Sequence, residues 1–307
     1  MKQSLSLPKE VLDTFLAKNN TKYDLMYNFG GGLGDVIKHL FNNSLYDQII
    51  EKSKDKKIII NLYCTNPFAR ELFYNIPNKQ NIKINIFDDV CEVLVQKMTR
   101  DQREKFLKEF NSEEINLDGN SSYIEKRKKN GHVNFFLSDE EEELITKIIN
   151  DIKKENKKIL IFCPFTGKTR TTPTKEYCDK VVDFINNDFF LLKVGRDFSL
   201  KYNEKRYDKE YLFKQEKVKD LTNKLSVPAT LELVKRSDGI VTSDTSILCY
   251  GDILDKPMFI MISDKNIEHY KNYNQYHYYL CFDKENVIFQ DWKGTDQESI
   301  NKFLKLL

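Results

Sequence analysis

The sequence predicts an α/β protein made of two Rossmann-like halves, each with a parallel sheet. A strand, turn, helix, strand pattern begins at Tyr23, and a second one begins at Ile159. The first contains a glycine-rich turn, Gly30 to Asp35, and the second a polar turn, Thr242 to Ser246; each lies between an apolar run and a helical one. The N–H groups at a helix start attract anions, so each turn is a candidate binding site for a ligand or a reacting group. One such site in each half predicts a cleft between the halves.

In the first half, strand-like and helix-like segments alternate. Tyr23 to Phe29 is an apolar run that stops at three glycines, and Asp35 to Ile50 carries apolar residues at roughly helical spacing. The continuous apolar run Lys57 to Cys64 is typical of a strand buried on both faces, so a βαβ unit with a parallel sheet is expected. The alternating isoleucines of Ile82 to Phe87 predict a third strand.

A helix followed by a charged linker is predicted at the end of the first half. Ser138 is a candidate N-cap for a helix over Ser138 to Lys154, and Glu141 completes a capping box. The hydrophilic stretch Lys153 to Lys158 is the predicted linker. We therefore expect an N-terminal domain over residues 1–154 and a C-terminal domain over residues 155–307.

The second half restarts the same pattern. Ile159 to Cys163 predicts a strand, and Pro173 to Asn187 predicts a helix with its proline in the first turn, where the fixed φ fits. Phe189 to Val194 predicts a second strand, ending at Gly195. Further strands are predicted at Gly239 to Thr242 and Met258 to Ile262, and further helices at Leu231 to Ser237, Thr245 to Leu254 and Thr295 to Leu307.

The composition is that of a globular protein with balanced charge. Its 307 residues are enough for two domains, and 40% hydrophobic residues supply a core for each. The 49 basic and 47 acidic residues leave a net charge of +2, which indicates neither a nucleic-acid nor a membrane partner. No apolar stretch approaches the roughly 20 residues of a membrane-spanning helix, and residues 1–10 lack the apolar core of a signal peptide, so a cytoplasmic protein is expected.

Metal and disulfide chemistry are not predicted. The 6 cysteines are scattered without a Cys-x-x-Cys pair, and the 4 histidines lie far apart with no His-Glu-x-x-His motif. We therefore expect reduced cysteines, no metal and no bound cofactor.

Two common phosphate-binding motifs are excluded. The glycine-rich turn superficially matches the dinucleotide fingerprint, but the second strand ends in Tyr63-Cys64-Thr65-Asn66, without an acidic residue for a ribose, which argues against NAD. Gly167-Lys168-Thr169 resembles the end of a Walker loop, yet Phe162 stands where the first glycine is needed. The four glycines of the first turn, followed by Asp35, favour close approach by a ligand over a simple tight turn.

Three motifs in order resemble glycosyltransferase family 9, the heptosyltransferases of the GT-B superfamily. They are Gly32-Leu33-Gly34-Asp35, a proline-containing loop after the Ile159 strand, and Asp220-Leu221-Thr222 leading through a short helix to Ser243-Asp244-Thr245. The resemblance runs from about residue 23 to residue 262. It implies two Rossmann-like domains facing across a central cleft, with the acceptor on the N-terminal side and the nucleotide-sugar donor on the C-terminal side. It also implies a last helix that can cross back to the first domain.

The resemblance further implies a metal-independent, inverting sugar transfer with Asp35 as the general base. A carboxylate at the cleft edge can take the proton of the acceptor hydroxyl as its oxygen attacks the anomeric carbon. The alternative for Asp35 is a purely structural one, in which a carboxylate in the first turn stabilises the helix dipole.

The donor side must stabilise a nucleoside diphosphate leaving group. The backbone N–H groups of Thr245 and Ser246 are candidates for the diphosphate, and the cations of Lys168 and Arg170 for added charge, although a solvent-facing loop has the same composition. The candidate binding residues are Gly31, Gly32, Gly34, Thr166, Lys168, Arg170, Gly195, Arg196, Ser243, Asp244, Thr245 and Ser246.

Departures from the family pattern fall on the donor side. The family turn continues Asp-Thr-Gly and then a histidine, where this chain has Ser246 and Cys249. The family's Lys-Arg-Trp-Pro-like segment is here Arg170-Thr171-Thr172-Pro173. The donor sugar and its nucleotide base therefore stay open.

The sequence thus predicts an inverting glycosyltransferase that moves a sugar from a nucleotide-diphosphate donor to an acceptor hydroxyl. A saccharide or lipopolysaccharide core is the first expectation for the acceptor, and a protein side chain or a modified nucleobase is also compatible. Two other classes would keep the same pair of domains: a nucleotide-sugar epimerase or hydrolase, and a non-catalytic protein that binds nucleotide sugars or glycans.

Overall fold

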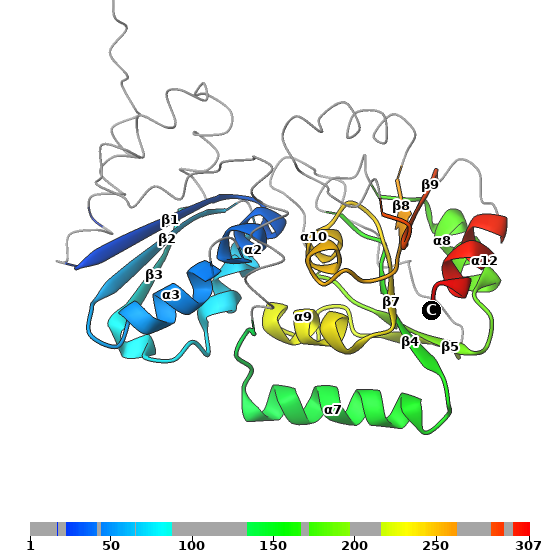
Figure 1. Cartoon of the computed structure of the whole chain (residues 1–307), viewed down its shortest axis with the longest axis horizontal. Coiled ribbons are helices and arrows are strands. Elements are labelled where there is room, and N and C mark those ends of the chain that lie inside the picture. The colour runs from blue at the N-terminus through cyan, green and yellow to red at the C-terminus, as the bar shows by residue number, and fades with distance from the viewer. Residues whose placement is uncertain are drawn as a thin grey trace, which may run out of the picture. The chain divides into compact units, whose positions relative to one another are not determined.

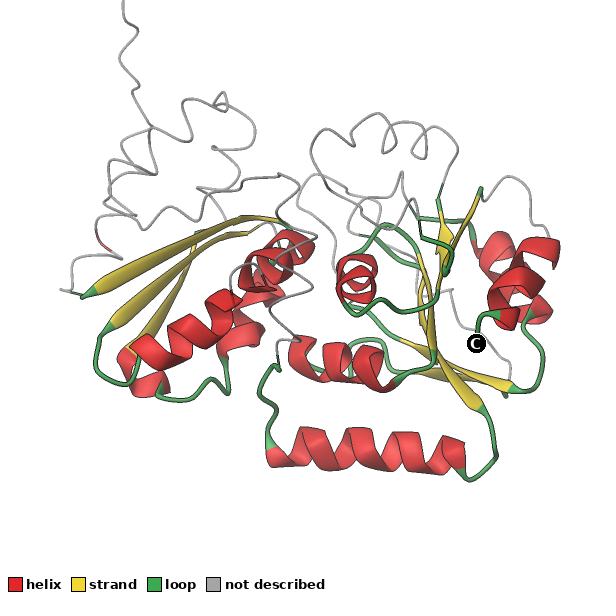
Figure 2. Cartoon of the chain, in the orientation of Figure 1, coloured by secondary structure: helices red, strands yellow, loops and turns green. Residues whose placement is uncertain are grey.

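The computed structural model confirms the α/β prediction, with parallel strands alternating with helices (Figures 1 and 2). The chain divides into two units, Met1–Asp118 and Gly119–Leu307. The structure describes residue 17 and residues 23–41, 44–64, 66–87, 134–166, 172–196, 216–262, 284–291 and 297–307.

The first unit contains a parallel sheet in the order β1-β2-β3. Its strands are β1 (Leu25–Gly31), β2 (Ile58–Cys64) and β3 (Ile82–Ile86), which confirms the three predicted strands. Its described helices are α2 (Leu33–Phe41), α3 (Leu45–Lys52), η2 (Pro67–Phe73) and η3 (Lys79–Asn81). Figure 2 shows α2 and α3 on one face of the sheet.

The helix predicted over Asp35 to Ile50 is wrong in one respect, because the structure has two helices there. Ser44, just before α3, has φ 52° and ψ 39°, the left-handed conformation. A right-handed helix cannot continue through such a residue, so the chain ends α2 and starts α3 in a new direction.

A ladder of asparagines crosses the sheet of the first unit. Asn28, Asn61 and Asn85 are partners in the strand register. Asn61 Nδ2 donates to Asn28 Oδ1 at 3.0 Å, and Asn85 Nδ2 donates to Asn61 Oδ1 at 3.0 Å. Asn61 is fully buried. Since a buried amide costs free energy unless it is hydrogen-bonded, a shift of any strand by one residue is penalised, and the ladder fixes the register.

The second unit is built on a parallel sheet in the order β6-β5-β4-β7-β8-β9. The strands are β4 (Lys158–Cys163), β5 (Phe189–Lys193), β6 (Val218–Asp220), β7 (Gly239–Thr242), β8 (Met258–Met261) and β9 (Val287–Gln290). The described helices are α7 (Asp139–Lys153), α8 (Lys175–Phe184), α9 (Val227–Arg236), α10 (Ser246–Ile253) and α12 (Gln297–Lys305).

Helices cover both faces of this sheet (Figure 1). On one face, α8 and α12 pack on a buried cluster that includes Leu160, Phe162 and Phe259. On the other face, α10 packs so closely that a Cβ on Gly251 would lie 2.5 Å from Cδ1 of Ile240. Both faces of the sheet are therefore core, which explains the continuous apolar runs of its strands.

The terminal helix and the helix before β4 both belong to the second unit. α12 packs against α8, β8 and β9, whereas the sequence allowed it to cross to the first domain. α7 packs against α9 and β4, and Arg236 on α9 forms an ion pair with Glu142 on α7. The chain thus divides after Asp118 rather than after residue 154, and residues 153–158 form the connection from α7 to β4 within one unit.

Helix starts follow the available capping groups. The predicted capping box is confirmed: Ser138 Oγ accepts from the N–H of Glu141, and Glu141 Oε2 accepts from the N–H of Ser138. Pro173, however, lies before the helix rather than in its first turn, because Thr174 is the N-cap of α8 and accepts from the N–H of Tyr177. The short strand β6 and the strand β9 were not predicted.

Asn61→Ala should lower the free energy of unfolding by about 2 to 3 kcal/mol, because it removes the fully buried amide that bridges Asn28 and Asn85 and takes away the acceptor of the buried Asn85 amide. Urea unfolding measures the change. Asn81→Ala is the matched control: its amide makes a 2.8 Å hydrogen bond to the backbone oxygen of Ser53 outside the ladder, so the cost should be about 1 kcal/mol. Equal losses in the two variants would contradict a special role for the ladder.

Candidate functional site

The sheet of the second unit places a candidate ligand site at the carboxyl ends of β4 and β7. These strands are neighbours, although β5 and β6 come between them in the sequence. The helices that follow them, α8 and α10, pack on opposite faces of the sheet. In open α/β sheets, ligands bind in the crevice outside the strand ends where the strand order reverses in this way.

Hydrogen bonds hold the loops after β4 and β7 together. The N–H of Ser243 donates to the backbone oxygen of Cys163 at 3.1 Å, and Ser243 Oγ donates to the backbone oxygen of Pro164 at 2.8 Å. Ser243 is fully buried. Ser243, one of the predicted binding residues, therefore joins the loops after β4 and β7.

The turn before α10 combines capping with exposed polar groups. Thr245 is the N-cap, and its Oγ1 accepts from the N–H of Ile247 at 3.2 Å and lies 3.0 Å from Oγ1 of Thr242. Asp244, Thr245 and Ser246 are partly exposed. The first N–H groups of a helix have no intrahelical partner, so this turn presents backbone donors beside partly exposed side chains.

The loop after β4 is closed at its base by two threonines. Thr166 is buried; its N–H donates to Thr172 Oγ1 at 3.2 Å, and the two hydroxyl oxygens lie 3.2 Å apart. The Thr166 hydroxyl therefore makes its contact with Thr172. Lys168 and Arg170, the predicted cations, lie outside the described residues.

A buried lysine lies at the carboxyl end of β5. The Lys193 side chain is only 6% exposed; its Nζ is 2.8 Å from Oδ2 of Asp220 at the end of β6, and it lies 5.2 Å from the ring centroid of Phe165. Burial raises the pKa of Asp220, but hydrogen bonds from Lys193 and Thr222 outweigh it and hold that pKa below its ordinary value. No role for Lys193 was predicted from the sequence. The feature that could have indicated one is a lysine between two apolar residues of a strand, Leu192 and Val194, which are both buried.

Gly195 and Arg196 follow directly at the same sheet edge. Gly195 has φ +140°, and its oxygen accepts from the N–H of Asn223 in the segment after β6. Arg196 is partly exposed. Their position agrees with a border of the crevice, two strands from β7.

In the first unit, the glycine-rich turn connects β1 to α2 through Asp35. Asp35 Oδ2 accepts from the N–H of Gly32 at 2.8 Å, three residues earlier, which closes the turn at the helix start. Gly31 ends β1, and Gly34 lies in the first turn of α2. The capping role is therefore present, and among the described residues nothing donates a hydrogen bond to the second carboxylate oxygen of Asp35. Asp35 is partly exposed, so that oxygen can serve a ligand.

A buried histidine, which sequence reasoning missed, lies one helical turn after Asp35. Burial lowers the pKa of His39 to about 4; the charge of Asp35 opposes this shift and that of Lys38 adds to it. Within the described part of the chain, His39 Nδ1 has no hydrogen-bond partner. A neutral imidazole thus packs behind the turn, with its ring centroid 6.4 Å from that of Phe29.

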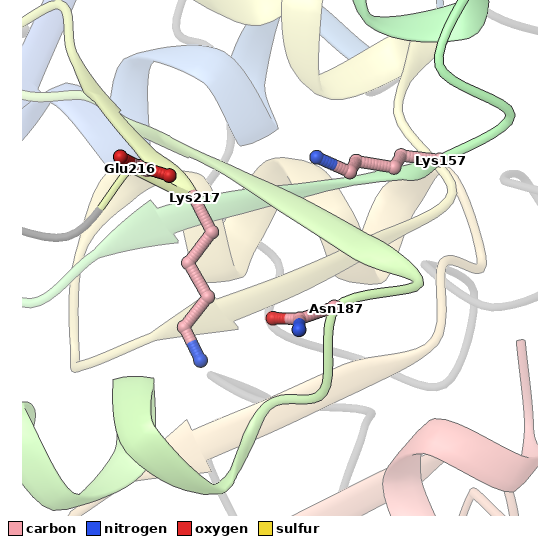
Figure 3. Close-up of a pocket in the computed structure, with 4 residues that line it drawn as sticks. All are labelled: Lys157, Asn187, Glu216 and Lys217. Carbon is pink, nitrogen blue, oxygen red and sulfur yellow. The ribbon is translucent and has the colours of Figure 1, made fainter.

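A shallow depression of about 480 Å³ opens at the opposite edge of the second sheet (Figure 3). Its lining residues Lys157, Asn187, Glu216 and Lys217 all lie just before strands, at their amino ends. In Figure 3 the ammonium groups of Lys157 and Lys217 point apart. Lys217 Nζ donates to the backbone oxygen of Ile185 at 2.5 Å. Open α/β sheets bind nucleotides at the carboxyl ends of their strands, so this depression is not at the end where a nucleotide is expected.

Within the described ranges, no group of three or more His, Cys, Asp or Glu side chains is arranged to hold a metal ion. No helix there has the length and apolar character needed to cross a membrane.

Comparison with known proteins identifies the fold. No protein-family model and no curated protein matches the sequence. Among solved structures, the chain is similar to the ADP-heptose lipopolysaccharide heptosyltransferase II of E. coli, with 10% identity and a TM-score of 0.53 over 92% of this chain and 98% of that chain. It is also similar to a glycosyltransferase of family 9 from Veillonella parvula, with 11% identity and a TM-score of 0.54 over 92% of this chain and 97% of that one. The protein therefore has the heptosyltransferase-like fold of family 9, a GT-B fold with two Rossmann-like domains.

Gly195→Ala should lower the free energy of unfolding by about 1 to 3 kcal/mol, because residues with a Cβ rarely adopt φ +140°. A Cβ at Gly195 would meet no atom within 4 Å, so the cost is backbone strain alone. Gly30→Ala is the control, since a Cβ there also meets nothing within 4 Å and Gly30 has no positive φ. Urea unfolding of both variants tests the difference; an unchanged Gly195→Ala protein would contradict it.

Acid should destabilise the protein through His39. Its pKa falls from 6.5 to about 4 on folding, so between these values the unfolded state binds the proton more strongly and stability falls as pH falls. From pH 7 to pH 5 the loss is about 2 kcal/mol. Urea unfolding at pH 7 and pH 5 measures this loss. The drop in the free energy of unfolding between the two pH values should be smaller by this amount for His39→Leu than for the wild type. Between pH 8 and pH 7 the two proteins should respond alike; the same acid sensitivity in both would refute the assignment.

Proposed function

We propose that this protein is a glycosyltransferase that uses a nucleotide-diphosphate sugar as donor. The observation that supports this most strongly is the reversal of strand order between β4 and β7 in the second unit, where Ser243 joins the loops that follow the two strands. This is the place where α/β sheets bind nucleotides. The family 9 fold supports the same class of donor.

The donor diphosphate would lie at the start of α10. The backbone N–H groups of Thr245 and Ser246 are suited to an anion, because the helix N-terminus carries a partial positive charge. Lys168 and Arg170 are the proposed cations that stabilise the charge growing on the leaving diphosphate, in a reaction that needs no metal. Gly195 and Arg196 would border the nucleotide.

Asp35 is the proposed general base. Its Oδ2 accepts from the N–H of Gly32, which orients the carboxylate and leaves the other oxygen to accept the proton of an acceptor hydroxyl. The acceptor oxygen would bond to the anomeric carbon from the side opposite the diphosphate as its proton passes to Asp35. The bond between the anomeric carbon and the diphosphate oxygen would break, and the diphosphate would leave with the electron pair, so the configuration is inverted.

A glycan-type hydroxyl, as in a saccharide or lipopolysaccharide core, is the proposed acceptor. The donor base and sugar are to be found by experiment. Ser246 and Cys249 replace the glycine and histidine of the family turn, so the ADP-heptose of the relatives is one member of the panel rather than the assumed donor.

Calorimetry with ADP, UDP, GDP, CDP and dTDP should find one diphosphate bound at micromolar level. With the matching nucleotide sugar and a glycan acceptor, Asp35→Asn should slow transfer by about 10² to 10⁴-fold and keep the affinity for the diphosphate. The asparagine oxygen can still accept from the N–H of Gly32, so the cap survives and only the base is lost.

Asp24→Asn is the matched control, because Asp24 Oδ2 accepts from the N–H of Lys57 at 2.8 Å at the other end of β1. It should transfer sugar as the wild type does. Rapid loss of the donor without any acceptor would instead identify an epimerase or hydrolase. Failure to bind any diphosphate would remove the transferase proposal.

A further inference from the structure

Lys193 is an unusual residue for its place in the fold. It ends β5 in the interior of a parallel sheet, between Leu192 and Val194, which are 0% and 1% exposed. Burying an ammonium group carries a large desolvation cost, and replacing a buried ion pair with apolar residues is often neutral or stabilising. Stability by itself therefore gives no reason for a lysine here.

The contacts of Lys193 join three neighbouring strand ends. Its ammonium group binds Asp220 Oδ2 at 2.8 Å, and its backbone oxygen accepts from the N–H of Leu221 at 2.8 Å, so the chain leaving β6 is attached at two points. Asp220 Oδ1 in turn accepts from the N–H of Thr222 at 2.8 Å. On the other side, Lys193 Nζ lies 5.2 Å from the ring centroid of Phe165, in the loop after β4.

The loop after β4 is thus held from two directions. Ser243 binds the Pro164 oxygen from the β7 side, and Lys193 lies over the next residue, Phe165, from the β5 side. Thr166 follows and makes its contacts to Thr172. Because the contact of an ammonium with an aromatic face is strong when it is removed from water, the Lys193 contact is suited to fixing this loop.

We propose that Lys193 is a positioning residue, which holds residues 164–166, directly after β4, in the geometry that favours binding of the donor diphosphate. The ligand in this inference, a nucleoside diphosphate, rests on the proposed glycosyltransferase function. The Lys193 side chain is only 6% exposed and paired with Asp220, so it acts through Phe165 rather than by touching the donor. Asp220, 37% exposed, lies at the surface end of the pair.

Lys193→Met tests this, because methionine fills the apolar stem of lysine without the charge. Binding of the diphosphate identified by calorimetry should weaken about five- to tenfold. The thermal midpoint should stay close to that of the wild type, because Asp220 is 37% exposed and water can hydrate its carboxylate in place of the ammonium group. Phe165→Leu should weaken binding similarly, and the double variant no further, because both changes break one contact. Lys193→Arg keeps the cation and should restore most of the affinity.

Lys217→Met is the matched control. Lys217 is a partly buried lysine just before β6, at the opposite edge of the same sheet, and burial lowers its pKa. Its loss should leave diphosphate binding unchanged. A Lys193→Met protein that binds as tightly as the wild type, or one whose affinity falls only together with its thermal midpoint, would overturn the proposal.

A second measurement separates this proposal from the proposed function. The N–H of Thr166 donates to Thr172 Oγ1, and hydrogen exchange of such an amide follows the population of its locally open form. Without any ligand, Lys193→Met should raise the exchange rate of the Thr166 N–H about five- to tenfold, and Lys217→Met should not. If no diphosphate binds the wild type, the proposed function fails, and an unchanged exchange rate then separately refutes the positioning role.

Discussion

The parallel pairing of β4 with β7 is the constraint on which the second unit depends. β4 lies in the middle of the sheet, and its Leu160, Ile161 and Phe162 are fully buried. Parallel neighbours cannot be joined by a tight turn, so the chain leaves β4, passes through α8, β5, β6 and α9, and returns as β7. The helices that follow β4 and β7 then pack on opposite faces of the sheet, and open α/β sheets bind ligands at such a reversal.

The polar groups buried at the carboxyl ends of these strands share one property: each holds two segments together. Ser243 joins the loops after β4 and β7, and Lys193 joins the ends of β5 and β6 to Phe165. A polar group buried in an apolar layer is costly unless it is satisfied, so such contacts strongly favour one arrangement of the loops. The asparagine ladder through Asn61 does the same for the strand register of the first unit. Ligand sites need loops held in this way, because a site that moves must spend binding energy on ordering itself.

The structural role of Asp35 is compatible with its proposed role as a general base. One carboxylate oxygen closes the turn on the N–H of Gly32, as the dipole interpretation of this residue requires. The same bond fixes the orientation of the group, which a general base also requires. His39, one turn later, is buried, and burial lowers the pKa of its imidazole to about 4.

The sequence by itself determined the class of fold and most of its elements. Apolar runs such as those of β2 and β4 require cover on both faces of the sheet. The Ser138 and Glu141 pair marks a helix start by local hydrogen bonds alone. Local chemistry did not specify Ser44, whose left-handed conformation splits a helix with continuous periodicity, nor β6, which is too short to show a pattern.

Only the tertiary structure decided which residues meet at the strand ends. The strand order brings together Cys163 and Thr242, and Lys193 and Asp220, which lie far apart in the sequence. It also decided that α7 and α12 pack with the second unit, because packing depends on which apolar faces find one another in space. Periodicity shows that a helix has an apolar face, but the surface that covers this face is set by the fold as a whole.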